Sequence, residues 1–226
     1  MSATIDEPRK TYLPGFGHDR LLPLYDPLQK LLGVASAHRP LVDQADIRPS
    51  HQVLEIGCGT GNLATLVKRL QPDAEVVGLD PDPKALARAR RKAERAAIPV
   101  HLELGFAEEL PYPDGSFDRV LSAFMFHHLE ADGKVKTLRE VRRVLKPGGS
   151  LHLLDLGGTK QQSDGVMARL QHRSERLRDN FGDRIPTLMR EAGFADSIEI
   201  AYRVTIVLGR VTYYRASVPC PAAGAA

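Results

Sequence analysis

The sequence has 226 residues, 42% of them hydrophobic, which is enough for one α/β domain with a full core and leaves little room for a second. With 31 Lys and Arg against 28 Asp and Glu, the net charge of +3 is too small to indicate nucleic-acid binding by itself. The two cysteines, Cys58 and Cys220, argue against a disulfide framework or a multi-cysteine metal site. No segment has the character of a secretory signal or a membrane span, so we expect a soluble, cytoplasmic protein. No metal site is predicted.

Residues 1–47 are predicted to form an N-terminal helical lid segment. Asp26, Pro27 and Gln29 are typical of a helix start, and this helix is expected to run to about Ala37, with a second short helix before Arg48. The segment either packs on the domain edge or covers a ligand, and both interpretations stay open. A membrane-surface helix is disfavoured by two prolines and scattered basic residues. The side chains that would line a substrate pocket are Tyr12, Phe16, His18 and Tyr25.

The stretch VLEIGCGTGNL, residues 53–63, predicts a strand, a tight turn and the start of a helix. An apolar run ends at Ile56 and is followed by Gly57, Gly59 and Gly61, after which leucines and valine recur at helical spacing. Glycines permit a sharp turn and leave the backbone bare, and the first amides of a helix are unpaired donors. We therefore expect a nucleotide-like ligand at this turn.

The stretch AEVVGLD, residues 74–80, is typical of a buried strand that ends on Asp80. Pro81 is expected to open the next helix, which should run to about Ala97. Its many Lys and Arg residues could form a nucleic-acid surface or a solvated helix face. The second interpretation is favoured because no aromatic residues are interleaved with the charges.

Two further strand and helix units follow in the same order. Strands are expected at VHLEL (100–104), FDRVLSAFMF (117–126) and LHLLDL (151–156), with a helix near residues 132–145 that KPGG ends. His127 and His128 follow the second of these strands. The third carries Asp155 near its end and leads into a turn at residues 157–158. Strands that alternate with helices indicate a parallel sheet.

The C-terminal part is expected to add helices near residues 166–180 and 184–192, and then two strands joined through Leu208 and Gly209 as an antiparallel hairpin. The predicted domain spans residues 48–215, and residues 216–226 are predicted to be a disordered tail. The expected fold is α/β, with a Rossmann-like seven-stranded sheet that is mostly parallel, helices on both faces and an antiparallel C-terminal hairpin.

The glycine spacing separates two kinds of nucleotide ligand. A dinucleotide-binding turn has the pattern G-x-G-x-x-G, whereas this chain has G-x-G-x-G with Glu55 two residues before the first glycine. A carboxylate there would repel a pyrophosphate and attract an ammonium group. Asp80 suits two ribose hydroxyls. The pattern favours a ligand with a ribose and a cationic amino-acid end, and a nicotinamide oxidoreductase becomes the least favoured class.

These motifs resemble those of class I S-adenosylmethionine-dependent methyltransferases, in the group of the ubiquinone and menaquinone biosynthesis C-methyltransferases. The resemblance covers about residues 48–156, through VLEIGCGTG, VVGLD, AEELPYPDGSFDRV, FHHL and LREVRRVLKPGGSLHLLD. It implies S-adenosylmethionine as cofactor and says little about the substrate. Many relatives carry an Asp where this chain has Phe106, so adenine contact would rest on ring packing and the Ala107 amide.

The resemblance also implies where the cofactor lies. Glu55 would lie near its amino group, Gly57 to Gly59 along its methionine end, and Asp80 at its ribose. Cys58 is interpreted as a small residue packed in the turn, not as a nucleophile. The expected cofactor-binding residues are Glu55, Gly57, Cys58, Gly59, Gly61, Asn62, Asp80, Pro81, Phe106, Ala107 and Ser122.

Methyl transfer from a sulfonium needs an aligned acceptor and, for a phenol, hydroxyl, thiol or carbon acid, a base. His127 and His128 are the candidates, with His127 preferred, although either could instead serve the fold. Phe126 is expected to line an apolar acceptor pocket. Weaker catalytic candidates are Asp155, His18, Tyr25 and His172.

We expect a methyltransferase for a small, apolar or aromatic molecule, with no nucleic-acid partner. Two alternatives stay open. One is a phospholipid headgroup N-methyltransferase at a membrane surface, and the other is a non-catalytic module that binds S-adenosylmethionine. The sequence does not predict the oligomeric state.

Overall fold

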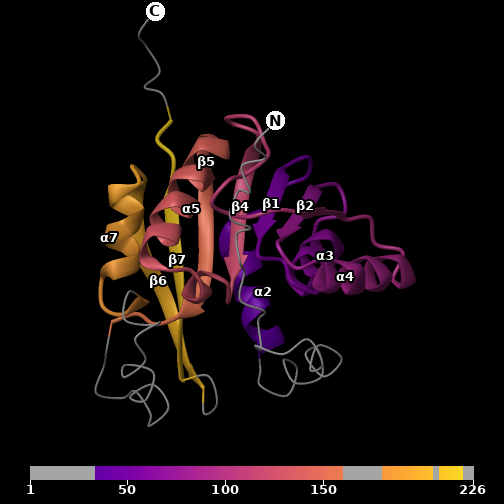
Figure 1. Ribbon diagram of the computed structural model, residues 1–226, viewed down its shortest axis with the longest axis horizontal. Helices are drawn as coiled ribbons and strands as arrows, with labels where there is room; N and C mark the ends of the chain where they lie inside the picture. The colour runs from indigo at the N-terminus through magenta and orange to yellow at the C-terminus, as the bar shows by residue number, and fades with distance from the viewer. Residues whose placement is uncertain (1–33, 160–179, 206–208, 221–226) are drawn as a thin grey trace, which may run out of the picture.

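The computed structural model describes residues 34–159, 180–205 and 209–220 (Figure 1). Its helices and strands in chain order are α2 (Val34–Ala45), β1 (Gln52–Ile56), α3 (Asn62–Leu70), β2 (Glu75–Asp80), α4 (Pro83–Arg95), β3 (His101–Leu104), β4 (Phe117–Ala123), the 3₁₀ helix η2 (Phe126–His128), α5 (Ala131–Val144), β5 (Leu145–Leu156), α7 (Arg184–Glu191), β6 (Ala195–Thr205) and β7 (Gly209–Ser217).

The strands form one sheet of seven in the order β3-β2-β1-β4-β5-β7-β6. The first five are parallel neighbours, and β7 runs antiparallel between β5 and β6. This confirms the predicted mostly parallel sheet with an antiparallel hairpin at its C-terminal end. The chain moves outward from β1 to β3 and then returns to the other side of β1 with β4, so the order of strands reverses between β1 and β4.

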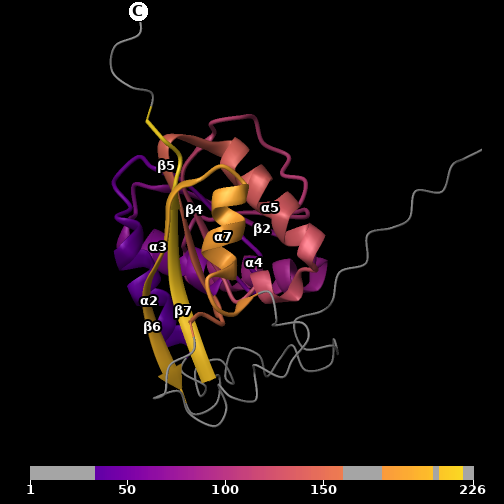
Figure 2. The ribbon, with the colours of Figure 1, turned by 90° about the vertical axis from the view of Figure 1, so that its left-hand side faces the viewer.

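Helices cover both faces of the sheet, as predicted (Figure 2). On one face, α2 and α3 pack in a core cluster with Val53 of β1 and Leu154 of β5. On the other, α5 and α7 share a cluster with Leu54 and Leu153, the neighbours of those residues. Successive side chains of a strand point to opposite faces, so each central strand contributes to both clusters.

The N-terminal helix differs from the prediction. The sequence predicts a helix that ends near Ala37 and then a second short helix before Arg48, whereas α2 runs without a break from Val34 to Ala45 with Pro40 inside it. Proline has no amide hydrogen to donate to Ser36, and the Ser36 carbonyl accepts from the Arg203 guanidinium at 3.5 Å. Leu41 and Val42 are buried in the core. The predicted lid boundary at residue 47 stays a prediction, but the described part of that segment belongs to the core.

Three other boundaries also differ. Helix α4 begins at Pro83, not Pro81, because the Asp82 side chain caps it by accepting from the Lys84 amide at 2.8 Å. The KPGG stretch belongs to β5, which starts at Leu145 opposite Phe117. At the C-terminal end, β7 pairs with β5 through Ser217, beyond the expected end of the domain at residue 215.

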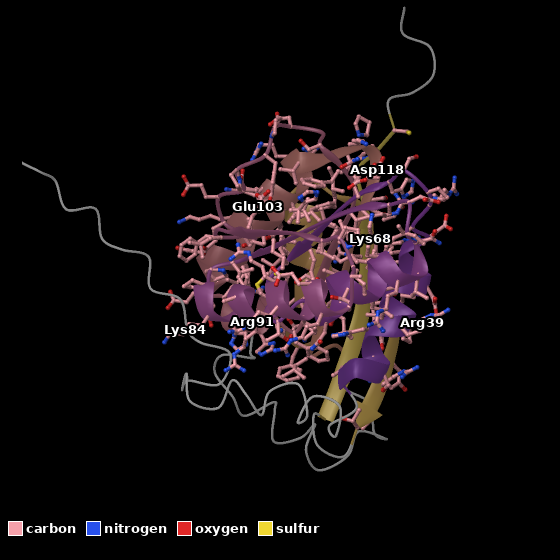
Figure 3. All side chains as sticks on the ribbon, turned by 90° about the vertical axis from the view of Figure 1, so that its right-hand side faces the viewer. Arg39, Lys68, Lys84, Arg91, Glu103 and Asp118 are labelled. Carbon is pink, nitrogen blue, oxygen red and sulfur yellow. The ribbon has the colours of Figure 1, made fainter. Side chains whose placement is uncertain are left out.

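The basic helix α4 has one buried side and one exposed side. Ala85, Leu86 and Ala89 are buried against the domain, whereas Lys84 and Arg91 are exposed (Figure 3). This is the arrangement of a solvated helix face.

No helix within the described ranges combines the length and the apolar character needed to cross a membrane.

Candidate functional site

The candidate site lies at the carboxyl ends of the parallel strands, where the strand order reverses. Ile56, the last residue of β1, pairs with Leu79 of β2 on one side and with Ser122 of β4 on the other. The segments that follow these three strands therefore start side by side. In open parallel sheets, ligands bind at this edge and at this reversal.

The turn after β1 needs glycine at each of its three positions. Gly57, Gly59 and Gly61 have φ values of 68°, 52° and 73°, a region that favours glycine. A Cβ at Gly57 would lie 2.3 Å from Cγ of Met125, and one at Gly61 would lie 3.0 Å from Cβ of Ala89. At Gly59 a Cβ would meet no described atom within 4 Å. The turn is thus packed at both ends and open in its middle.

Four backbone amides of the turn, which precede the helix amides predicted as unpaired donors, are used inside the protein. Gly57 and Cys58 both donate to the Leu79 carbonyl, at 2.8 and 3.1 Å. Gly59 donates to Oδ2 of Asp80 at 2.7 Å, and Gly61 donates to the Cys58 carbonyl at 2.8 Å. A pyrophosphate site requires several amides directed at the ligand. These four amides are therefore not available to bind a pyrophosphate. The glycine spacing likewise disfavours a dinucleotide.

Asp80 is held by the backbone on both of its oxygens. Oδ2 accepts from Gly59, and Oδ1 accepts from the Asp82 amide at 2.9 Å. The side chain is buried, and burial raises the pKa of Asp80 while the two amides act in the opposite direction. Each carboxylate oxygen keeps a second lone pair. Asp80 is therefore an oriented acceptor at the end of β2, suited to two neighbouring hydroxyls.

Glu55 is a buried carboxyl with an incomplete set of partners. It accepts a hydrogen bond from the Ala64 amide, in the first turn of α3. Its Oε2 atom is buried and has no hydrogen-bond partner among the described residues. Burial raises the pKa of Glu55 well above its ordinary value, and the nearby Asp80 charge adds to this. A cationic group beside Oε2 would supply what the site lacks.

The side chains of Cys58 and Asn62 contact β2 and α4. Sγ of Cys58 packs against Gly78 of β2, and burial raises the pKa of this thiol far above its ordinary value, so it is no nucleophile. Asn62 accepts from Nζ of Lys92 at 2.6 Å, and the same Nζ lies 3.3 Å from Oγ1 of Thr60. Lys92 of α4 thereby fixes the outer side of the turn. These contacts of Cys58 and Asn62 stabilise the turn, and the predicted role of both residues in cofactor binding stays a prediction.

The loop after β3 borders Asp80. Gly105 donates its amide to the Asp80 carbonyl at 3.2 Å, which brings Phe106 and Ala107 beside the end of β2. Phe106, Ala107 and Pro81 are all half-buried. The contact of these residues with an adenine ring stays a prediction.

Two predicted site residues prove to be fully buried. Ser122 has no exposed surface, and its hydroxyl has no partner in the part of the chain that the structure describes. Phe126, predicted to line the acceptor pocket, instead packs in the core cluster with residues of α5 and α7. The reason is that β4 ends at Ala123 and not at Phe126.

Phe124 turns the chain sharply after β4. Its amide still donates to the Leu154 carbonyl at 2.8 Å, but its φ is 55°, which is rare for an aromatic residue. Such left-handed conformations of bulky residues are strained and often occur at functional sites. The turn interrupts the alternation of the strand, directs Phe126 into the core and brings His127 to the end of β5.

His127 and Asp155 form a close pair. Nδ1 of His127 lies 2.6 Å from Oδ1 of Asp155, and the His127 amide donates to Oδ2 at 3.1 Å. The Asp155 side chain is fully buried, whereas the His127 side chain is 19% exposed. The ring of His128 lies 4.2 Å from that of His127. Sequence reasoning had ranked Asp155 only as a weak candidate. The available signal was that Asp155 and His127 lie at the ends of two consecutive predicted strands.

Five candidate residues lie outside the part of the chain that the structure describes. They are the predicted substrate-pocket residues Tyr12, Phe16, His18 and Tyr25, and the weak catalytic candidate His172.

A hollow of about 480 Å³ is lined by Arg139, Arg142 and Leu145, among others. Leu145 pairs with Phe117 at the beginning of β4, so this hollow is at the opposite edge of the sheet from the glycine turn. It is not part of the candidate site.

S-adenosylmethionine fits the residues that are present. Its ribose requires an acceptor such as Asp80, and its amino group requires an acceptor such as the unpartnered Oε2 of Glu55. The open side of Gly59 leaves room between them for a chain without clash. A dinucleotide fits less well because the turn amides are already used.

Comparisons with known proteins identify the family of the chain. Residues 53–149 match a family described as a methyltransferase domain. The demethylmenaquinone methyltransferase of Thermus thermophilus is 40% identical over 153 residues, covering 66% of this chain and 69% of that protein. The enzyme of the same name from Symbiobacterium thermophilum is 30% identical over 231 residues, covering 87% and 88%. A SAM-dependent methyltransferase structure from Aquifex aeolicus shares the fold, with a TM-score of 0.58, 18% identity and coverage of 79% and 88%.

Proposed function

The chain belongs to the class I S-adenosylmethionine-dependent methyltransferases, and from this premise we propose that it methylates a small acceptor of apolar or aromatic character. The names of the two relatives, which denote demethylmenaquinone as acceptor, support an acceptor of this kind. The observation that carries the proposal is the turn from Gly57 to Gly61, with its amides used internally and the carboxyl groups of Glu55 and Asp80 beside it.

S-adenosylmethionine supplies, when bound, a methyl group that is already activated on a sulfonium. The protein then has to hold two molecules in line and exclude water. Asp80 binds the ribose hydroxyls through the lone pairs that Gly59 and Asp82 leave available. Glu55 accepts from the amino group through Oε2. Gly57, Gly59 and Gly61 keep side chains out of the space between them.

A proton acceptor is needed for any acceptor atom that carries hydrogen. His127 and His128 lie just beyond the carboxyl end of β4, and His127 contacts Asp155 at the end of β5. General base catalysis by a well-placed histidine contributes on the order of a hundredfold or more. The two histidines are the groups of suitable ordinary pKa at this edge within the described ranges.

Isothermal titration of the wild-type protein with S-adenosylmethionine and with S-adenosylhomocysteine tests the cofactor site. Both should bind, and Asp80→Ala should weaken both at least tenfold. Asp43→Ala is the matched control, because Asp43 is an exposed residue of α2 whose carboxylate pairs with Arg39. The proposal for the site is overturned if neither compound binds the wild type, or if the two variants behave alike.

The acceptor is identified by incubating the wild-type protein and S-adenosylmethionine with hydroxyaromatic, amine and phospholipid acceptors. Formation of S-adenosylhomocysteine and of methylated product is followed by mass spectrometry. We expect turnover with hydroxyaromatic compounds. Turnover with phosphoethanolamine lipids alone would replace the proposed acceptor class, and cofactor binding without turnover on any class would favour a non-catalytic module.

A further inference from the structure

The Asp155 carboxylate is fixed by the backbone on both oxygens. Oδ1 accepts from the Leu156 amide at 2.6 Å, and Oδ2 accepts from the His127 amide at 3.1 Å. The side chain is fully buried at the end of β5. Its position therefore does not depend on the imidazole ring that it contacts. A carboxylate held in this way can orient a partner without moving itself.

This arrangement determines which nitrogen of His127 carries the proton. Oδ1 of Asp155 lies 2.6 Å from Nδ1, and an ionised carboxylate only accepts hydrogen bonds. Nδ1 of the neutral ring must therefore be the donor, which leaves the lone pair on Nε2. No hydrogen bond to Nε2 occurs within the described part of the chain, and the side chain is partly exposed. The choice of His127 rests on this geometry alone.

We propose that His127 is the general base of this enzyme and that Asp155 is its positioning residue, and this inference rests on the proposed function. As the acceptor oxygen or carbon forms its bond to the methyl carbon, Nε2 of His127 takes the proton from the acceptor. The electron pair of the broken carbon–sulfur bond returns to sulfur, which becomes a neutral thioether. Asp155 stabilises the imidazolium through Nδ1.

The other charged or titratable groups around the pair come from three elements. The ring of His128 lies tilted beside that of His127, and Nζ of Lys134 of α5 lies 5.7 Å from the centre of the adjacent Phe126 ring. On β7, the side chains of Tyr214 and Arg210 are buried. Tyr214 interacts electrostatically with Arg210 and with Asp155. Among the described groups, only Asp155 is in direct hydrogen-bond contact with the imidazole of His127.

The pair predicts how the rate depends on the acceptor. A base helps only when the acceptor still carries its proton at the assay pH. A phenol that is already ionised under those conditions needs alignment and nothing more. The contribution of His127 and Asp155 should therefore grow with the pKa of the acceptor and disappear for ionised acceptors.

The test compares wild type with Asp155→Asn on a series of phenols whose pKa values lie below and above the assay pH. The Asn side chain cannot accept from both backbone amides, and it lacks the negative charge that stabilises the imidazolium in the transition state. We expect kcat for the high-pKa phenols to fall about a hundredfold or more, and kcat for ionised phenols to change less than threefold. The dissociation constant of S-adenosylhomocysteine should stay within twofold of wild type.

Asp114→Asn is the matched control. Asp114 is an exposed residue of the loop before β4, and its carboxylate pairs with Arg143 of α5. Asp114→Asn should leave kcat unchanged for every phenol in the series. An equal loss for all phenols in Asp155→Asn would mean that Asp155 only supports the fold, and the inference would be overturned. Failure of the proposed function has a different signature, because then the wild type itself would bind no cofactor or methylate no acceptor.

A second variant keeps the inference testable if Asp155→Asn does not fold. His127→Ala removes the ring but keeps the amide that contacts Asp155. It should lose activity on high-pKa phenols and regain at least tenfold of that activity when imidazole is added. Absence of rescue in a folded variant that still binds S-adenosylhomocysteine would contradict a general base at this position.

Discussion

The backbone amide of Gly59 donates to Oδ2 of Asp80 over 2.7 Å, which ties the turn after β1 to the end of β2. The other oxygen of Asp80 holds the Asp82 amide, next to the start of α4. One buried carboxylate thus organises two segments of the candidate site. Its proposed contact with the ribose is a third task of the same group.

Asp80→Asn should separate these tasks. The amide oxygen can replace one carboxylate oxygen, but the NH₂ group opposes the other backbone amide, and we expect a loss of about 1–3 kcal/mol in the free energy of unfolding. Cofactor affinity of the folded variant should fall at least tenfold. Urea denaturation and isothermal titration measure the two effects. A stability loss with unchanged affinity would show that Asp80 acts on the turn alone.

Gly57→Ala and Gly59→Ala form a matched pair with different expected defects. Both positions have positive φ, so each alanine should cost on the order of 1 kcal/mol from its backbone conformation. At Gly57 the new methyl also meets Met125, whereas at Gly59 it enters open space. Gly57→Ala should therefore be the less stable protein. Gly59→Ala should lose only this backbone cost in stability but bind S-adenosylhomocysteine at least tenfold more weakly, because its methyl enters the space of the ligand.

Thermal denaturation and titration on both variants check this pair. If Gly59→Ala binds the compound as tightly as wild type, the ligand does not lie along the middle of the turn. Met125→Ala in the Gly57→Ala background should recover part of the lost stability, because it removes the contact but not the strain in φ.

The sequence predicted the order of elements because the hydrophobic periods and the glycine and proline signals are local. It also placed Glu55 and Asp80 correctly at strand ends. It could not predict that the turn amides are used, because their acceptor, the Leu79 carbonyl, comes from the pairing of β1 with β2. Such a contact depends on register and not on composition.

The errors near β4 have one cause. The run FDRVLSAFMF continues the strand pattern through Phe126, and nothing in it signals that Phe124 adopts a φ of 55°. That turn moves Phe126 into the core and His127 towards Asp155. The contact between His127 and Asp155 also required the knowledge that β4 and β5 are neighbours, with Ala123 opposite Leu154. Tertiary pairing, not local sequence, created the dyad.

Two buried histidines outside the site should make the fold sensitive to mild acid. Burial lowers the pKa of His152 to about 3 and that of His38 to about 4, from an ordinary value of 6.5. Below pH 6.5 the unfolded chain takes up protons at these positions while the folded protein does not. The unfolded state binds more protons in that window, so stability falls as the pH decreases towards 4. At pH 5 each histidine should remove on the order of 2 kcal/mol.

Urea denaturation at pH 7.5 and pH 5.0 measures this loss. In His152→Asn, the side-chain oxygen can still accept from Gln44, which lies 3.1 Å from Nδ1 of His152. The variant should lose about half of the acid sensitivity, although it is less stable than wild type at pH 7.5. His101→Asn, an exposed residue of β3, is the control and should keep the wild-type difference. An unchanged pH difference in His152→Asn would show that His152 is not the source.

Cofactor binding should release a proton from Glu55. Burial raises the pKa of this carboxyl in the protein without ligand, and Oε2 has no partner among the described residues. A bound ammonium group favours the ionised form and lowers that pKa, so the ligand binds the deprotonated protein better. Affinity should then rise with pH from the pKa of the bound form up to the raised pKa of the ligand-free form, and level off above it.

Isothermal titration in two buffers with different ionisation enthalpies counts the released protons at each pH. Glu55→Gln keeps an oxygen for the Ala64 amide but has no proton to release, so the difference from wild type isolates Glu55 from other groups. We expect wild type to release up to one proton more than Glu55→Gln, and the variant to bind about tenfold more weakly, as for a lost charged hydrogen bond. Equal proton release in both proteins would mean that the amino group of the cofactor lies elsewhere, and that Glu55 serves only as an acceptor for the first turn of α3.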